Sequence, residues 1–382
     1  MAGESDALLR IVPVTERRHL TDFIRVPWSV YRDDRHWIAP LTAERRLHLS
    51  KKNPYFAHAE AAFFVAYRGS EPVGRISAQI NQLHLDEQRD DTGHFGFIEA
   101  IDDSEVFRSL FEEAESWLRQ RGMKRILGPF NLSINDECGL LIEGFETPPM
   151  FLMGHGRPYY DARIKELGYE KAKDTFAYML AASEPRPMVM EAALRRASER
   201  VHIRPVRLSN LKDELEVLKE IYNDAWKDNW SFIPFTTAEF EDMGKSLKYF
   251  VPPEFIQIVE VEGEPVAMIV AIPNLNDVIA DLDGKLLPFG WMRLLWRQRY
   301  AKPTTGRVPL MGIRRKYQRS SLGMLLVFML VNAVREAMIG YGIQHVELSW
   351  TLEDNHPMRR IMKRLGAREY KTYRFYERAL VS

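Results

Sequence analysis

The hydrophobic and polar positions of the chain follow one order twice. In each half, a strand–turn–strand pattern precedes a third strand, a long amphipathic helix, another strand, a short helix that ends at Leu-Gly, and a last strand. Alternating β-branched and aromatic residues predict the strands, whereas apolar residues three and four positions apart predict the helices. Strands are expected at residues 63–68, 73–80, 94–101, 125–130, 175–180, 255–261, 265–272, 308–313, 345–350 and 370–376. Helices are expected at residues 104–121, 159–167, 211–226 and 357–365, and from about residue 322 onward.

Local similarity supports an internal repeat. Residues 69–76 match residues 262–269 as strand–turn–strand, and residues 121–126 match residues 341–346 as the end of a helix and the start of a strand. An order of elements that occurs twice predicts two related α/β units. The expected boundaries are an N-terminal domain at residues 1–182, a charged linker at 183–200 and a C-terminal domain at 201–382.

Composition narrows the class of protein. The 382 residues carry 53 basic and 53 acidic side chains, and this balance argues against a nucleic-acid partner. The single Cys138 excludes a disulfide framework, and no His, Cys and carboxylate set shows the spacing of a metal site. The N-terminus lacks the order of a signal peptide, and no window approaches 18 uninterrupted apolar residues. We therefore expect a cytoplasmic protein without a metal.

The most informative stretch runs from the strand at residues 308–313 into a basic loop and then into a long apolar helix. The first N–H groups of a helix have no intrahelical partner, and the helix dipole adds positive potential there. Small residues such as Ser320, Ser321 and Gly323 let a ligand approach the backbone closely. This stretch therefore predicts a site for an anion such as a pyrophosphate, and the alternative is a solvated basic turn that caps a core helix.

The same stretch resembles the coenzyme A loop of the GNAT acyltransferase superfamily. Gln318, Ser321 and Gly323 fill the three fixed places of its motif, with Ser321 where the family usually has its first glycine. The order of elements in both halves is also that of GNAT domains, so the resemblance implies two tandem domains, each a mixed, mostly antiparallel sheet flanked by helices. It further implies an acyl-CoA co-substrate. The expected contacts with coenzyme A are Met311, Gly312 and Ile313 for the pantetheine arm, Gln318, Arg319, Ser320, Ser321, Leu322, Gly323 and Met324 for the pyrophosphate, and Asn355 at the mouth.

The first half lacks such a loop. In its place stand acidic residues, among them Asp102, Asp103 and Glu105, which suit the start of a helix but would repel a pyrophosphate. We therefore expect only the second half to bind coenzyme A.

Candidates for the chemistry come from both halves. Many relatives place a tyrosine acid seven residues after the mouth asparagine, but this chain has Met362 there. Glu353 is the first candidate for the general base, with Glu347 nearby in sequence, although a loop carboxylate or a helix cap explains Glu353 equally well. In the first half, Asn135 and Glu137 belong to a polar cluster that forms either a buried scaffold or the lining of a site. Cys138 fits a buried thiol better than a nucleophile.

The second half also carries about 27 additional residues before its long helix. From Leu286 to Lys302 this insertion combines Trp291, Met292, Leu294, Leu295 and Trp296 with several arginines, which suits a bilayer surface, a lipid tunnel or packing against the sister domain. The whole pattern resembles the bacterial YghO-like branch of tandem GNAT proteins, which includes bacterial ceramide synthases. The resemblance implies an N-acyltransferase that moves a long acyl chain to a sphingoid base, and the segment 286–302 suggests peripheral contact with the inner membrane surface. Acetyl transfer to a small amine or peptide, and a non-catalytic acyl-CoA sensor, remain alternatives.

Overall fold

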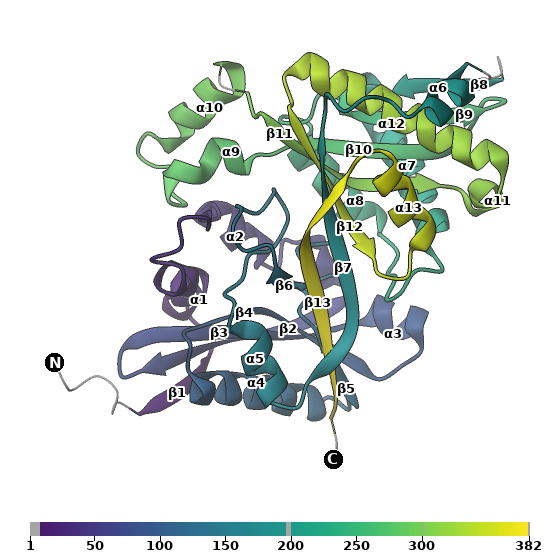
Figure 1. The fold of residues 1–382 in the computed structure, drawn as a ribbon. Helices are drawn as coiled ribbons and strands as arrows, with labels where there is room; N and C mark the ends of the chain where they lie inside the picture. Colours follow the sequence, from purple (N-terminus) through teal and green to yellow (C-terminus); the bar gives the residue numbers. More distant parts are fainter. Residues whose placement is uncertain (1–7, 196–199, 301, 381–382) are drawn as a thin grey trace. The chain divides into compact units, whose positions relative to one another are not determined.

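The computed structural model describes residues 8–195, 200–300 and 302–380, without the side chains at positions 295, 298 and 299. The chain forms two compact units (Figure 1). Unit 1 contains the chain up to residue 175, the short segment 282–286 and the chain from residue 371 onward, and unit 2 contains Phe176–Asp281 and Leu287–Tyr370. Each unit is therefore assembled from segments that are distant in the sequence.

Unit 1 is a mixed sheet flanked by helices. Its strands lie in the order β1, β2, β3, β4, β5 and β13, with β6 also paired to β13, and β4 and β5 are the parallel pair. The strands are β1 (Leu9–Pro13), β2 (Ala59–Arg68), β3 (Glu71–Asn81), β4 (Thr92–Ala100), β5 (Arg125–Gly128), β6 (Leu140–Glu143) and β13 (Arg368–Ala379, in unit 1 from residue 371). The helices are α1 (Arg17–Val30), α2 (Thr42–His48), the short η1 (Pro54–Ala57), α3 (Gln82–Gln88), α4 (Ser104–Arg119) and α5 (Tyr160–Glu166).

Helix α4 shows how the sequence produces this packing. Its apolar residues recur at helical spacing, and Val106, Leu110 and Ala114 are fully buried on the side of the helix that contacts β2 and β3. At its start, the side chain of Asp103 accepts hydrogen bonds from the N–H groups of Glu105 and Val106. Of the acidic residues predicted to begin this helix, Asp103 therefore serves as its cap.

The last strand of the chain belongs to the sheet of unit 1. Tyr376 of β13 lies opposite Gly128 of β5 in an antiparallel pair. Arg374 donates hydrogen bonds of 2.8 and 2.9 Å to the two carboxylate oxygens of the buried Asp174. Because a bidentate pair accepts only one geometry, it helps to hold the strand in register. No sequence pattern pointed to this placement.

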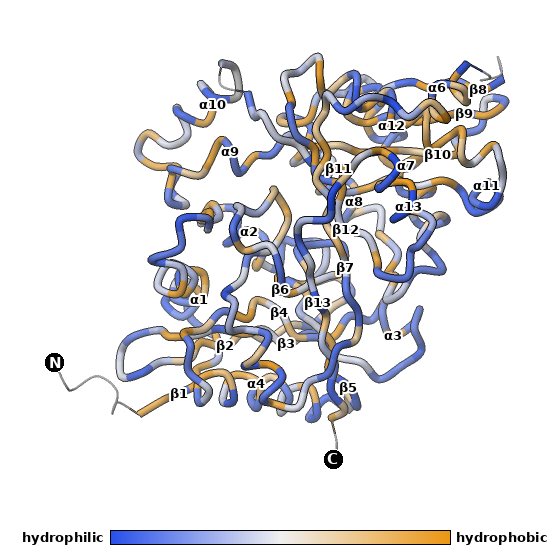
Figure 2. Tube along the Cα trace, viewed as in Figure 1, coloured by the Kyte–Doolittle hydropathy of each residue, from blue (hydrophilic) through white to orange (hydrophobic). Residues whose placement is uncertain are grey.

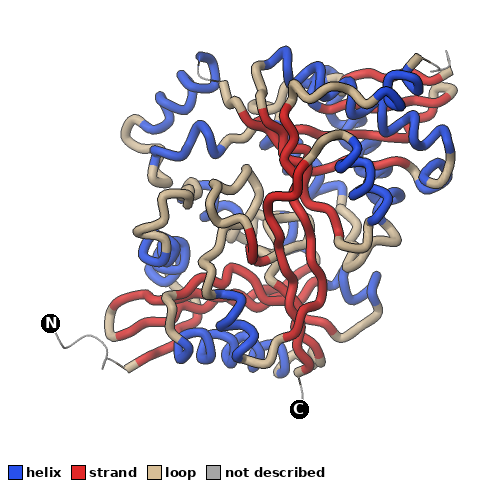
Figure 3. Tube along the Cα trace, viewed as in Figure 1, coloured by secondary structure: helices blue, strands red, loops and turns tan. Residues whose placement is uncertain are grey.

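Unit 2 repeats the architecture. Its strands, which are labelled in Figure 1 and drawn in red in Figure 3, lie in the order β7, β12, β11, β10, β9 and β8. The parallel pair is β11 and β12. The strands are β7 (Glu170–Ala181, in unit 2 from residue 176), β8 (Val201–Pro205), β9 (Ile256–Val261), β10 (Glu264–Pro273), β11 (Thr305–Ile313) and β12 (His345–Leu352). The helices are α6 (Met188–Leu194), η2 (Leu208–Asn210), α7 (Leu211–Trp226), α8 (Thr237–Leu247), η3 (Pro253–Phe255), α9 (Asn276–Ile279), η4 (Ala280–Leu282), α10 (Gly290–Tyr300), α11 (Arg315–Gln318), α12 (Ser321–Tyr341) and α13 (His356–Arg364).

Helix α12 is the central helix of unit 2. It is the one described helix that is long and apolar enough to cross a membrane. Its residues Leu326, Leu330, Val334 and Met338 are buried, however, and the helix contacts β9 and β10, which are themselves rich in apolar residues (Figure 2). We therefore interpret α12 as a core helix.

The expected fold class is confirmed, since each unit is a mixed α/β structure with a mostly antiparallel sheet. Every expected strand and helix is present, with ends that differ by up to five residues. The structure adds short elements whose patterns were too brief to interpret, among them β1, β6, β8 and α3.

Candidate active site

In unit 2, the parallel strands β11 and β12 separate at their carboxyl-terminal ends. Residue pairs join them from Thr305 opposite His345 to Val308 opposite Leu348. On its other edge, β11 pairs with β10 in an irregular register. Leu310 lies opposite Val270 and Arg307 opposite Ile272, so β11 has one extra residue here and carries a bulge near Pro309. A bulge bends its strand and interrupts pairing. Residues 308–311 are accordingly only partly buried, although β11 lies inside the sheet.

Unit 1 has the same bulge, but its opening is filled. The parallel pairing of β4 and β5 ends at His94 opposite Leu127, and β4 carries an extra residue where it passes β3. Beyond that point the N–H of Phe130 donates to the carbonyl of Phe95 at 2.8 Å, and the side-chain oxygen of Asn131 accepts from the N–H of Phe97 at 2.7 Å. As a result, β4 is buried continuously from Thr92 to Ile98.

Gly96 shows how closely this filling segment approaches β4. A β-carbon at position 96 would lie 1.7 Å from the carbonyl oxygen of Phe130, so only glycine fits. The same carbonyl also accepts a hydrogen bond of 2.7 Å from the Gln79 side chain. The opening of unit 1 is therefore occupied by the chain itself.

The loop after β11 forms a tight turn into α12. The Ser320 hydroxyl donates to the carbonyl of Tyr317 at 2.7 Å and accepts from the N–H of Gly323 at 3.0 Å, so Ser320 caps the helix. A β-carbon on Gly323 would lie 2.1 Å from the carbonyl oxygen of Tyr317. The N–H groups of Ser321 and Leu322 are those that helix geometry leaves without an intrahelical partner. Ser321 is exposed and Leu322 and Met324 lie at the same helix start.

Acidic partners offset much of the loop's positive charge. Three of its basic side chains form ion pairs within unit 2: Arg314 with Glu220 at 3.3 Å, Arg315 with Asp228 at 3.3 Å and Lys316 with Glu264 at 2.6 Å. Arg319 is exposed and has no acidic partner within 4.0 Å among the residues that the structure describes. Of the four basic side chains at the loop, Arg319 is therefore the one best able to meet an anion.

Gln318 and Gly312 have structural roles at this site. The Gln318 side-chain amide donates to the carbonyls of Ala225 at 2.9 Å and Ile313 at 3.0 Å, which joins the loop to α7 and β11. A β-carbon on Gly312 would lie 2.3 Å from the ring of Trp226. The end of α7 therefore packs directly on the strand that is expected to line the ligand, and Met311 is the partly buried residue between Gly312 and the bulge.

The residues after β12 form a capped helix start. The Asn355 side-chain oxygen accepts from the N–H of Met358 at 3.2 Å, which leaves its amide N–H groups for another partner. Glu353 is partly buried, and its carbonyl accepts a hydrogen bond of 2.9 Å from Arg359. Met362 is buried in an apolar cluster with Tyr178 and Ala367. The position at which relatives carry a tyrosine is thus part of the core here.

A buried polar cluster adjoins the opening between β11 and β12. The Glu347 carboxylate, which is fully buried, accepts hydrogen bonds from the hydroxyls of Ser349 and Tyr370. Arg307, on the neighbouring strand, donates to the Ser349 hydroxyl at 2.7 Å and lies 3.5 Å from Glu347. Arg307 and Glu347 are opposite each other, one pair before the strands separate.

Sequence reasoning identified Glu347 but missed its partners. Arg307 and Ser349 are isolated polar residues within apolar strands, and such residues are a usable signal of a buried network. Tyr370 lies on the last strand, so its proximity to Glu347 depends on strand pairing that the sequence does not reveal.

Glu137 and Asn135 lie in unit 1 within a hydrogen-bonded scaffold. Arg45 donates to one oxygen of Glu137 at 2.7 Å and Asn131 donates to the other at 3.3 Å. Burial favours a higher pKa for Glu137, but the charge and hydrogen bond of Arg45 outweigh it, so the pKa lies below its usual value. The N–H of Asn135 donates to the Ser133 hydroxyl at 3.2 Å. Both residues thus support the segment that fills the unit 1 opening, which favours the scaffold interpretation.

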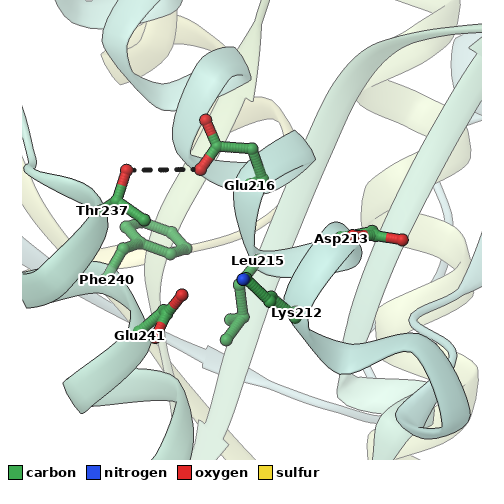
Figure 4. A pocket seen from close by; sticks show the side chains of 7 residues that line it. All are labelled: Lys212, Asp213, Leu215, Glu216, Thr237, Phe240 and Glu241. Atoms are coloured by element: carbon green, nitrogen blue, oxygen red, sulfur yellow. Dashed lines mark hydrogen bonds between the residues drawn. The ribbon is translucent and has the colours of Figure 1, made fainter.

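Unit 2 also contains a small pocket between α7 and α8, of about 180 Å³ (Figure 4). Its lining is mainly charged, and Thr237 donates to Glu216 at 3.4 Å across it. None of its lining residues comes from β11, the basic loop or α12, so it does not belong to the opening described above. Within the described residues, no three His, Cys, Asp or Glu side chains are grouped as metal ligands would be.

Comparison with known proteins agrees with these features. Residues 215–367 match the model of the acetyltransferase (GNAT) family, a range that includes β11, the loop and α12. The chain is 45% identical over 368 residues to Protein YghO of Escherichia coli K12, covering 95% of this chain and 94% of that protein. It is also 45% identical over 380 residues to the bacterial ceramide synthase of Caulobacter vibrioides, covering 98% of this chain and 99% of that protein.

Solved structures share the architecture over the whole chain. A tandem GNAT protein from the clavulanic acid biosynthesis pathway has a TM-score of 0.58 at 11% identity and covers 98% of this chain and 99% of its own. A GCN5-related N-acetyltransferase from Sphaerobacter thermophilus has a TM-score of 0.54 at 12% identity, covering 97% and 96%. At such low identity these structures bear on the fold alone.

Proposed function

The chain belongs to the GNAT acyltransferase family, and from this premise we propose that it transfers a long-chain acyl group from an acyl-CoA thioester to the primary amine of a sphingoid base. The observation that carries the proposal is the open edge of β11, next to a glycine-dependent loop and a buried carboxylate. The choice of acyl donor and acceptor is supported by the relative named bacterial ceramide synthase, which this chain matches at 45% identity.

The residues of unit 2 fit a coenzyme A thioester. The backbone of Met311, Gly312 and Ile313 would bind the pantetheine arm along the edge of β11, beyond the point where its pairing with β12 ends. The N–H groups of Ser321 and Leu322, together with Arg319, would meet the pyrophosphate, since the start of a helix favours an anion. An oxyanion forms on the thioester carbonyl when the amine attacks it. Pro309 has no N–H, so the backbone N–H groups of β11 that could bind this oxyanion belong to the residues after Pro309.

The chemistry requires that the attacking amine lose a proton. We assign this role to a relay through Tyr370 and Glu347, because the Tyr370 hydroxyl already donates to the buried carboxylate. The amine nitrogen forms a bond to the thioester carbonyl carbon and its proton passes to the Tyr370 oxygen, while the Tyr370 proton passes to Glu347. The carbon–sulfur bond then breaks, and the proton held by Glu347 returns through Tyr370 to the leaving thiolate. Arg307 and Ser349 hold the carboxylate in place.

A lipid acceptor also bears on location. Sphingoid bases partition into membranes because of their long chains, so we propose that the reaction takes place at the inner membrane surface with acyl-CoA supplied from the cytoplasm.

The test is a turnover assay with the purified protein. We expect free thiol release from palmitoyl-CoA that depends on sphinganine, with an N-acylated product identified by mass spectrometry. Strict preference for acetyl-CoA would overturn the long-chain proposal, and a lack of amine-dependent release over a broad acceptor panel would overturn catalysis. Comparing Glu347→Gln with Glu353→Gln identifies the base: the relay requires the larger loss of kcat in Glu347→Gln, and the reverse result assigns the role to Glu353.

A further inference from the structure

Helix α10, inside the insertion of unit 2, exposes an apolar stripe. Phe289, Met292, Trp296 and Tyr300 are 67%, 51%, 59% and 68% exposed. Met292, Trp296 and Tyr300 are four residues apart, which places them on one face of α10, and Phe289 lies in the turn directly before the helix. The rings of Trp296 and Tyr300 lie 5.9 Å apart. The sequence suggested a broader face, but Trp291 binds the carbonyl of Pro288 through its indole N–H, Leu294 is partly buried, and the side chains of Leu295 and Arg299 lie outside the described part.

The orientation of α10 is fixed by one arginine. Arg297 donates to the carbonyl of Val278 at 2.7 Å and forms a bidentate pair with Asp281. Both partners belong to the segment of α9 and η4 that precedes the helix. Because a bidentate pair is directional, it anchors that side of the helix and leaves the stripe exposed.

The charge around the stripe is mostly positive. Residues 287–303 contain the cations Arg293, Arg297, Arg299 and Lys302 and no acidic residue, whereas the whole chain has a net charge of zero. The nearby Asp281 neutralises part of this charge, because it pairs with Arg297 and lies 3.7 Å from Arg293. The Arg293 side chain is 63% exposed and its contact with Asp281 is long, so it can also meet an anion. A partner that complements this surface is therefore apolar with some negative charge.

The area and the residue types indicate what kind of partner this is. Large side chains that are about half exposed present roughly 100 Å² each, so four of them form a patch on the order of 400 Å², the size of the largest patch on a typical monomeric protein, which is often functional. Trp and Tyr favour the boundary between headgroups and acyl chains, where one end of the ring is wet and the other is not.

We propose that α10 docks unit 2 onto an anionic lipid bilayer, with the stripe inserted between headgroups and Arg293 meeting their phosphates. The inference rests on the proposed function, because an acceptor amine that is dissolved in the membrane requires the enzyme to bind at the membrane surface. It adds to that function a specific surface and a requirement for anionic lipid.

The test is co-sedimentation of the full chain with vesicles of phosphatidylcholine containing about one third phosphatidylglycerol, and with vesicles of phosphatidylcholine alone. We expect binding to the anionic vesicles that falls with added salt. The double variant Met292→Glu/Trp296→Glu is expected to bind about tenfold or more weakly, because two carboxylates oppose both insertion and the lipid charge. The matched control is Tyr249→Glu, at another side chain of unit 2 that is 67% exposed; it is expected to stay within about twofold of the parent protein.

Three results would overturn the proposal. The first is absence of vesicle binding by the parent protein, and the second is equal binding by the double variant. The third is a concentration-dependent dimer that the double variant abolishes, because the stripe would then be an interface between two copies. Thermal unfolding checks that the variants fold. Vesicle binding is measured without turnover, so a failure of docking can be told apart from a failure of the acyl-transfer proposal.

Discussion

The substitution Gly323→Ala tests the proposed pyrophosphate loop most directly. The new β-carbon would lie 2.1 Å from the Tyr317 carbonyl oxygen, whereas atoms in contact need more than 3 Å. Because the atom in the way is backbone, the turn at residues 317–320 must move by about 1 Å, and overpacking of this kind costs about 1–3 kcal/mol. The gain in helix propensity on replacing glycine is about 1 kcal/mol at most, so we expect a net loss of stability of up to about 2 kcal/mol.

The effect on the ligand follows from the same displacement. A shift of about 1 Å lengthens hydrogen bonds beyond their useful range, and each bond to a charged group contributes about 1.5–3 kcal/mol. Losing one of these bonds weakens binding by about 10- to 100-fold, since 1.4 kcal/mol corresponds to a factor of ten. We therefore expect Gly323→Ala to reduce the affinity for coenzyme A by at least about tenfold.

The same helix supplies a matched control. Gly340 lies in α12, and a β-carbon there would meet nothing within 4 Å. Gly340→Ala should therefore raise stability by about 0.5–1 kcal/mol, which corresponds to roughly 1–4 °C in Tm for a unit of this size. Its affinity for coenzyme A should be unchanged.

Isothermal titration with coenzyme A and a thermal scan on both variants complete the experiment. Equal affinity of the two variants would show that the loop does not hold the pyrophosphate. A Tm that rises as much in Gly323→Ala as in Gly340→Ala would refute the steric argument itself.

Three further predictions concern the cluster, the strand and the filled opening. Tyr370→Phe should lower kcat about 10²- to 10⁴-fold with little change in acyl-CoA affinity, and a loss of affinity alone would contradict the relay. Burial alone would raise the pKa of Asp174, but the hydrogen bonds from Arg374 outweigh it and hold the pKa below its usual value. The stabilisation from these bonds therefore exists above about pH 4 and is lost below it. The Tm difference between the parent and Arg374→Met should shrink from neutral pH to about pH 3, and a constant difference would contradict this assignment. Asn131→Ala should lower the free energy of unfolding by about 1–3 kcal/mol, and the variant should still bind one coenzyme A per chain. A stoichiometry of two coenzyme A molecules per chain would argue against the filled opening.

Much of the architecture follows from local pattern. The helix Leu211–Trp226 has the predicted bounds, because its apolar periodicity ends where the packing ends. The loop at residues 314–320 was also found from sequence, since small and basic residues between a strand and a helix have few other uses. The pairing of the loop cations with α7 and β10 was not visible, because it depends on elements about 50 to 90 residues away in the chain.

Long-range strand pairing accounts for what was missed. β13 lies in the sheet of unit 1 from residue 371 onward, whereas Tyr370, near the start of the same strand, belongs to unit 2 and bonds to Glu347 there. Period-two patterning assigns a strand and its buried face but carries no information about its neighbour. Met362 illustrates the converse: the sequence shows that tyrosine is absent there, and the structure adds that the position is buried.

The two units together explain why the first carries about 22 additional residues after β5. Both units have the bulge that separates their parallel strands, so the opening is a property of the fold and does not depend on a ligand. Within an opening that no ligand fills, the N–H of Phe97 and the carbonyl of Phe95 would lose their partners, at about 1–3 kcal/mol for each buried group. Asn131 and Phe130 supply those partners from the start of the added segment, and Arg45 and Glu137 hold that segment in place. The added segment of unit 1 therefore supplies from its own chain the partners that these strands require, whereas unit 2, which has no such addition after β12, retains the accessible edge.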